Sequence, residues 1–167
     1  MGKVVEGKLT ELDIQLLYEA AKVAHQSKME GNHPFGALLA DKEGRILIRA
    51  GNDHRQSPAL HAETKVMLEA GERFSSDFLA TCTLYTTAEP CVMCTGALYW
   101  TNVRRLVYGI SEEQLLNLTG SSDENPTFSL DCRSVIEAGQ KDIIVIGPVE
   151  DTLLRETILA DHRGFWK

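Results

Sequence analysis

The chain has 167 residues, of which 43% are hydrophobic and 25% charged, proportions that are typical of a globular protein with one core. No apolar run reaches the roughly 18 residues that a transmembrane helix needs, and the first residues lack the apolar core of a signal peptide. We therefore expect one cytoplasmic domain over residues 1–167 with no membrane partner. The net charge of −7 disfavours a dedicated nucleic-acid binder.

The apolar pattern predicts helices that alternate with strands. The first predicted elements are a helix capped by Thr10 and ending near Glu30, two strands over 35–40 and 45–50, and a helix that opens at Ser57-Pro58. They are followed by a strand over 82–87, a helix with Pro90 in its first turn and a strand over 104–110. The last predicted elements are a helix capped by Ser111, a strand over 142–147 and a helix over 151–160. After an initial hairpin, this order predicts an α/β fold, a three-layer α-β-α sandwich with a mostly parallel five-stranded sheet. The polar stretch over 119–126 is predicted to be a loop, either a lid or a plain connector.

Two short stretches carry groups that can bind a metal. The first contains His61, with Glu63 two residues later, and the second contains Cys91 and Cys94. Three such ligands fit one Zn²⁺ per chain with an open fourth position, as in catalytic zinc sites. Both stretches lie at predicted helix N-termini, where the exposed N–H groups favour thiolates. Glu63 is poorly placed to bind the same ion beside His61, but it can reach a metal-bound water and act as the catalytic acid and base.

Each part of this set also has a plainer interpretation. A lone histidine is more often structural than a ligand, and a lone C-x-x-C is typical of a redox pair or of half a structural zinc site. A structural site usually has a fourth ligand at short spacing, and none lies next to either stretch. The six positions together favour a catalytic metal site. The remaining cysteines, Cys82 and Cys132, are predicted to be buried small hydrophobes.

The pattern H-x-E followed by P-C-x-x-C is the signature of zinc deaminases that act on nucleobases, and the chain resembles the cytidine/deoxycytidylate deaminase superfamily, especially its small nucleobase deaminases. The resemblance covers about 34–108. It includes Pro-Phe-Gly-Ala over 34–37, a stretch over 84–97 that is very similar to fungal cytosine deaminase, and Ala-Leu-Tyr-Trp over 97–100, which is closer to bacterial guanine deaminase. This resemblance implies the same α/β fold and a hydrolytic deamination.

The resemblance also implies contacts with a bound base. Asn52 closes the second predicted strand where the family has a base-contacting Asn, and its amide can both donate and accept hydrogen bonds. The backbone N–H of Ala62 and the carbonyl near Glu89 are implied to hold the ring edge. The candidate stacking walls are Phe35, Trp100 and Trp166, and ordinary core packing is the alternative for the first two.

We expect the substrate to be a free amino-substituted base, such as cytosine, isocytosine, guanine or an aminotriazine, with release of ammonia. One alternative is tRNA adenosine-to-inosine deamination, although that branch ends in a basic helix and the tail here is charge-balanced. The other is deamination of a nucleoside, guanosine or cytidine. The stretch over 111–126 lacks the acidic Phe-Asp-Asp motif of bacterial guanine deaminase. Only eight residues separate Asn52 from His61, which disfavours the deoxycytidylate branch with its inserted zinc ligands.

The tail over 161–167 leads to a hypothesis about substrate size. A Phe-Trp pair at a free terminus is an apolar liability in water, so we expect Phe165 and Trp166 to cap the pocket while Asp161 accepts a hydrogen bond from a ring N–H. Such a lid would leave little room for a ribose. The resemblance further implies a homodimer, with the Ala-Leu-Tyr-Trp run over 97–100 as a candidate contact.

Overall fold

The computed structural model describes residues 2–120 and 122–166, so residue 121 of the predicted loop and residue 167 of the tail lie outside the described residues. The strands are β1 (Val4–Glu6), β2 (Gly36–Ala40), β3 (Ile46–Gly51), β4 (Thr83–Ala88), β5 (Arg105–Ile110) and β6 (Ile143–Ile146). The helices are α1 (Glu11–Met29), α2 (Ala62–Arg73), α3 (Ser76–Leu79), α4 (Val92–Thr101), α5 (Glu112–Thr119), α6 (Cys132–Glu137) and α7 (Thr152–His162). Within the described ranges, no helix combines the length and the apolar character that a membrane span requires.

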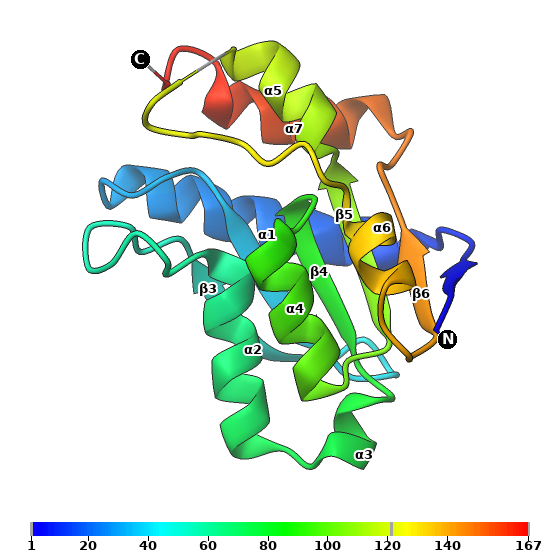
Figure 1. The fold of residues 1–167 in the computed structure, drawn as a ribbon. Helices are drawn as coiled ribbons and strands as arrows, with labels where there is room; N and C mark the ends of the chain where they lie inside the picture. The colour runs from blue at the N-terminus through cyan, green and yellow to red at the C-terminus, as the bar shows by residue number, and fades with distance from the viewer. Residues whose placement is uncertain (1, 121, 167) are drawn as a thin grey trace.

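The six strands form one mixed sheet in the order β1-β6-β5-β4-β2-β3 (Figure 1). β2 runs antiparallel to β3 and β4, while β4, β5, β6 and β1 run parallel to their neighbours. The predicted hairpin and the mostly parallel sheet are therefore confirmed. The sheet has one strand more than the five predicted, because β1 has three residues, too few to give an alternating pattern.

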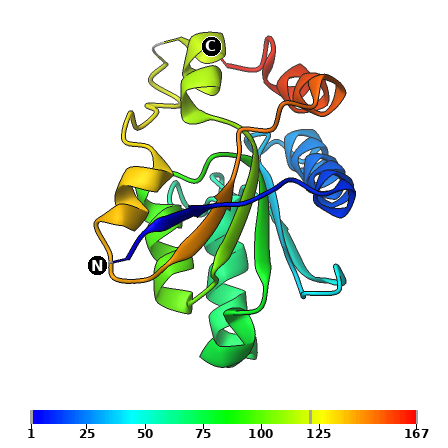
Figure 2. The same cartoon turned by 90° about the vertical axis from the view of Figure 1, so that its right-hand side faces the viewer.

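Helices cover both faces of the sheet (Figure 2). α1 and α7 lie on one face, and α2, α4 and α6 lie on the other. Each face has its own buried core. The first core includes Leu17, Leu38, Val107 and Ile158, and the second includes Val66, Leu84, Leu98 and Leu106. The predicted three-layer sandwich is confirmed, and Cys82 and Cys132 are buried in the second core.

Helix α1 is fixed to the sheet through its first turn. The Thr10 side chain accepts from the Asp13 N–H, and the Asp13 carboxylate accepts from the Thr10 N–H, which makes the predicted capping box. The same carboxylate accepts hydrogen bonds from both terminal nitrogens of Arg105, each at 2.8 Å, and from the Tyr85 hydroxyl at 2.6 Å. Farther along α1, a Cβ on Gly36 would overlap the Ala20 carbonyl, so only glycine lets β2 lie this close to the helix.

Two helices begin later than the sequence predicted. α2 begins at Ala62 instead of Ser57-Pro58, because residues 53–60 form turns that are closed by a hydrogen bond from the Asp53 N–H to the Leu60 carbonyl (2.9 Å). α4 begins at Val92, because the residue before it is extended, with ψ of 177°. Pro90 therefore precedes the helix instead of lying in its first turn.

The C-terminal half contains the other differences from the prediction. α7 ends at His162, two residues beyond the predicted end, so Asp161 lies in the helix and not in the tail. The short helices α3 and α6 were not predicted. They have four and six residues, fewer than two turns, and so give little periodic signal.

Candidate metal centre and its cavity

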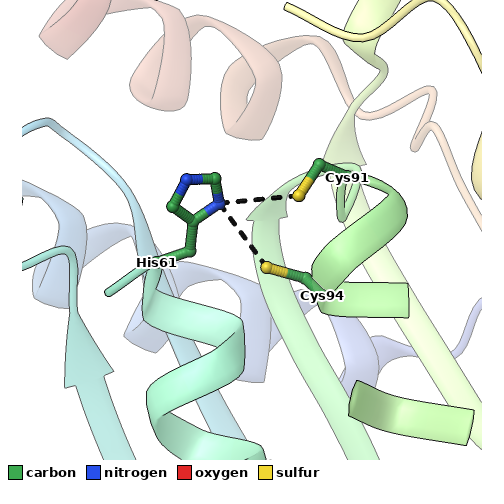
Figure 3. Close-up of side chains that lie close together, drawn as sticks. All are labelled: His61, Cys91 and Cys94. Atoms are coloured by element: carbon green, nitrogen blue, oxygen red, sulfur yellow. Dashed lines mark hydrogen bonds between the residues drawn. The ribbon is translucent and has the colours of Figure 1, made fainter. Parts of the chain in front are cut away.

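The proposed metal ligands lie where two neighbouring helices begin. His61 is the N-cap of α2 and Cys91 is the N-cap of α4, and neither side chain makes the usual capping hydrogen bond. Both side chains are therefore directed to each other instead of to their own helix ends (Figure 3). Cys94, in the first turn of α4, is fully buried and accepts a hydrogen bond from the Thr64 hydroxyl (3.2 Å). N-cap positions usually hold Ser, Thr, Asp or Asn, whereas here they hold a histidine and a cysteine, which can bind a metal.

The three ligand atoms have the spacing of a tetrahedral zinc site. His61 Nδ1 lies 3.6 Å from the Sγ atoms of both Cys91 and Cys94. Zn–S bonds of about 2.3 Å and Zn–N bonds of about 2.0–2.1 Å at tetrahedral angles place nitrogen and sulfur about 3.6 Å apart. The three residues present therefore fit one Zn²⁺ and leave its fourth position to a small molecule.

The charges of the centre also favour a divalent cation. The Cys94 thiol and the nearby His61 lower the pKa of Cys91 to about 4, whereas its neighbour Cys91 and burial raise the pKa of Cys94 well above its usual range. One thiolate thus forms unaided, and the second needs a cation to stabilise it. Zn²⁺ supplies that charge and neutralises both thiolates.

Glu63 lies in the first turn of α2, beside the ligand cluster. Its side chain is 5% exposed, and burial raises the pKa of its carboxyl group. The Thr86 hydroxyl lies 2.7 Å from Glu63 Oε1 and 2.9 Å from the Ala88 carbonyl. Because a hydroxyl can donate once and also accept, Thr86 can donate to ionised Glu63, or accept from protonated Glu63 while it donates to Ala88. The contact therefore suits a carboxyl group that gains and loses a proton.

A cavity of about 490 Å³ opens at this centre. It lies where β4 and β5 end, since Ala88, Glu89 and Glu112 line it, and the carboxyl edge of parallel strands is the usual binding site in open α/β sheets. The other lining residues are His33, Phe35, Asn52, His54, Pro58, His61, Glu63, Cys91, Leu115 and residues 123–128.

Three of the predicted substrate contacts lie at this cavity. Phe35 and Asn52 line it from the two ends of the β2–β3 hairpin, and Glu89 lines it from the end of β4. Asn52 Oδ1 already accepts the His54 backbone N–H at 2.8 Å, so the amide nitrogen of Asn52 is the group left to donate to a ligand. The N–H of Ala62 is among the first four of α2, which a helix leaves without internal partners.

The structure does not bring the other predicted contacts to the cavity. Trp100 lies in the last turn of α4, about 13 Å along the helix from Cys91, and is 80% exposed. Asp161 accepts from His25 Nδ1 at 2.8 Å on the α1–α7 side. Phe165 and Trp166 are not among the lining residues, but both rings pack against the lining residue His33, with centroids 6.0 Å and 4.7 Å from it.

Sequence reasoning missed two histidines in the wall. His33 and His54 stack with ring centroids 3.6 Å apart and planes 15° apart, and Glu124 Oε1 lies 3.4 Å from His33 Nε2. These three residues form a second group with metal-ligand chemistry. Ring lone pairs lie in the ring planes, so two nearly parallel stacked rings direct them side by side and not toward one ion. In the sequence, His33 directly precedes Pro34 and His54 lies two residues after Asn52, and these positions were the available signals that both histidines lie near the cavity.

Comparisons with known proteins agree with this geometry. Residues 10–110 match the model of the cytidine and deoxycytidylate deaminase zinc-binding region. The chain is 37% identical over 161 residues, 95% of both chains, to a "probable cytosine deaminase" from Schizosaccharomyces pombe. It is 39% identical over 93 residues, 54% of this chain and 57% of the relative, to the tRNA-specific adenosine deaminase of Bacillus subtilis.

Solved structures are also similar to this chain over most of its length. The guanine deaminase of Nitrosomonas europaea covers 95% of this chain and 88% of its own, with 25% identity and a TM-score of 0.62. A variant of the protein NE0047 in complex with 8-azaguanine covers 90% of this chain and 81% of its own, with 28% identity and a TM-score of 0.67. His61, Cys91 and Cys94 form the zinc-binding set within the matched region. The chain therefore belongs to the cytidine and deoxycytidylate deaminase family of zinc-dependent deaminases.

Proposed function

We propose that this protein catalyses the hydrolytic deamination of a free amino-substituted nucleobase, with release of ammonia. The observation that carries the proposal is the convergence, in one cavity, of three zinc-binding side chains and the buried carboxyl group of Glu63. The relatives named for cytosine and guanine deamination, and the neighbour that binds 8-azaguanine, support a base as the substrate.

The chemistry needs a nucleophile and a mobile proton. Zinc, when bound, lowers the pKa of a water ligand towards neutrality. Glu63 takes the proton from the attacking water at one carboxylate oxygen and delivers it to the ring nitrogen beside the amino-bearing carbon. A second transfer through Glu63 moves the remaining proton of the added hydroxyl to the amino nitrogen. The C–N bond then breaks, ammonia departs, and the oxygen of the water stays on the ring as a carbonyl. Thr86 holds Glu63 in place through both transfers.

The ring is held by groups that face the cavity from three elements. The Asn52 amide nitrogen is free to donate to a ring carbonyl, because its oxygen is already engaged by His54. Phe35 supplies an apolar surface for one face of the ring. The Ala62 N–H and the Glu89 carbonyl complete the contacts by family resemblance.

The charge of the cavity favours an unphosphorylated substrate. Glu63, Glu112, Asp123 and Glu124 line it, and its described lining includes no lysine or arginine. A phosphate group placed away from the zinc would meet carboxylates without a lysine or arginine to pair with, which costs free energy in a partly buried site. Nucleotides and the tRNA backbone are therefore disfavoured.

The volume keeps a nucleoside as the second candidate. A cavity of about 490 Å³ falls in the range of roughly 300–1,000 Å³ that accommodates drug-sized ligands. A single base leaves part of that space unfilled, and a pentose could occupy the remainder. The tail does not exclude it, because Phe165 and Trp166 are not among the lining residues of the cavity.

We also propose that the protein self-associates. α4 carries an exposed apolar stripe made of Met93 and Trp100, 38% and 80% exposed, and the open position of Gly96 and the partly buried Ala97 lie between them on the same helix face. The hydrophobic effect favours covering such a stripe with a second copy.

The deciding experiment measures ammonia release from free bases, nucleosides, nucleotides and short RNA. We expect a free base to have the highest kcat/KM. On that base, Glu63→Gln should lower kcat by about 10²–10⁴-fold with one zinc per chain retained, because the amide still accepts from Thr86. Glu69→Gln is the matched control, since it makes the same change on the solvent side of α2. Near-normal turnover by Glu63→Gln, or activity confined to RNA, would sink the proposal.

A further inference from the structure

One buried carboxylate of the cavity wall has a role that the chemistry above does not use. Glu89 is 5% exposed, and its two carboxylate oxygens accept different backbone N–H groups. Oε1 accepts the Glu112 N–H at 3.1 Å, and Oε2 accepts the Cys132 N–H at 2.8 Å. These are the first residues of α5 and α6, so one side chain binds the N-termini of two helices. An anion is favoured at each of those ends.

The segment between these two bonds forms one wall of the cavity. We call residues 112–120 and 122–132 the strap. It contains α5, the loop that follows and the first residue of α6, and it contributes Glu112, Leu115 and residues 123–128 to the lining. Glu124 also reaches the opposite wall, 3.4 Å from His33. Both ends of the strap therefore meet at the Glu89 side chain, while the middle of the strap lines the cavity.

The Glu89 backbone is itself fixed relative to the metal. Its N–H donates to the Ile110 carbonyl at the end of β5 (2.8 Å), and Pro90 follows it directly. The next residue is the zinc ligand Cys91. A single short, rigid stretch thus joins the metal centre to both ends of the substrate wall.

We propose that Glu89 is a positioning residue, whose carboxylate holds the strap at a fixed distance from the zinc ligands and so sets the width of the cavity. This role belongs to the side chain and is separate from any contact of the Glu89 carbonyl with a base. The proposal about Glu89 rests on the proposed function only for its kinetic test, because the ordering of the strap can be measured without a substrate.

The test compares Glu89→Ala and Glu89→Gln with the wild type, all loaded with zinc. Hydrogen exchange of strap amides should rise about tenfold or more in Glu89→Ala, since two charge-assisted hydrogen bonds are lost. Glu89→Gln should show a smaller rise, because an amide oxygen replaces only one of the two acceptors. For the base identified by the substrate screen, KM should rise about tenfold in Glu89→Ala with kcat within about threefold, and zinc should stay at one per chain.

Asp131→Ala is the matched control. Asp131 caps only α6, by accepting the Ser134 N–H at 2.7 Å, so its loss should lower Tm with KM unchanged. Unchanged strap exchange in Glu89→Ala, or loss of zinc from both Glu89 variants, would overturn the proposal. If Glu89→Ala does not fold, the exchange and KM of Glu89→Gln decide. If the wild type deaminates no base, the proposed function fails, and the exchange data still settle the role of Glu89.

Discussion

The contact between Asp13 and the sheet predicts a specific pH dependence of stability. The Asp13 carboxylate is buried, which by itself raises its pKa, but hydrogen bonds from Arg105, Tyr85 and the Thr10 N–H lower the pKa from 3.8 to about 2. Because the folded value lies below the unfolded one, this stabilisation is fully present above about pH 5 and is lost as the pH falls towards 2. The difference corresponds to about 2 kcal/mol, of which about 1 kcal/mol is lost between pH 7 and pH 3.

Asp13→Asn removes the titrating group while it keeps the size of the side chain. At pH 7 we expect the variant to unfold about 3 kcal/mol more easily, the lower end of the cost of breaking a buried ion pair, because the Arg105 side chain remains 26% exposed. Urea unfolding at pH 7 and pH 3 measures the free energy of unfolding of both proteins. Their difference should shrink by about 1 kcal/mol at pH 3, since any effect of protonating the zinc ligands is common to both.

Tyr85→Phe provides a graded control. It keeps the carboxylate and its contact with the Arg105 guanidinium but removes the hydroxyl that donates to Asp13 at 2.6 Å and accepts from Arg105 at 3.3 Å, so its unfolding free energy should fall by about 1–2 kcal/mol at pH 7. A wild-type minus Asp13→Asn difference that stays constant or grows from pH 7 to pH 3 would refute the reasoning, because the carboxyl group would then titrate alike in the folded and unfolded chains.

Two further predictions concern the aromatic residues outside the cavity. Trp166→Ala should raise KM by about three- to tenfold without loss of zinc, because it removes the ring that packs against His33; an unchanged KM would show that the tail does not support the wall. Trp100→Glu should convert a sedimenting dimer to a species of 18.5 kDa, because it places a charge in the exposed stripe of α4; an unchanged dimer, or a wild type that is already monomeric at micromolar concentration, would contradict that interface.

The metal centre could be predicted from the sequence because its two stretches, although 30 residues apart, are each short and together match the signature of zinc deaminases. His61 and the two cysteines each lie in the first residues of a helix, so their spacing along the chain sets their directions. The layers of the fold could be predicted for a similar reason, because alternating strands and helices have few ways to pack. The zinc set and the mostly parallel sheet are confirmed, whereas the catalytic role of Glu63 stays a prediction.

The substrate wall could not be predicted, because it depends on how distant segments meet. Whether Trp100 faces the cavity or solvent depends on which end of α4 carries the ligands. The apolar Phe-Trp pair predicts a tail that caps the pocket, but the path of the tail after α7 depends on its contacts with distant residues such as His33. His33 and His54 are 21 residues apart and become neighbours only when the two loops at this edge of the sheet come together. The loop over 119–126 could equally have been a connector, and its residues 123–126 line the cavity.

The strap has a consequence for how this protein could change its substrate. All zinc ligands and Glu63 lie within residues 10–110, the stretch that matches the family model, whereas the strap begins after it. The zinc ligands and one wall of the cavity are thus encoded in consecutive parts of the chain that Glu89 connects, whereas Phe35 and Asn52, on the other walls, lie within the matched region. Mutations at Leu115 and residues 123–128 can reshape the wall with the metal ligands untouched, so divergence in substrate choice can proceed there without passing through an inactive enzyme.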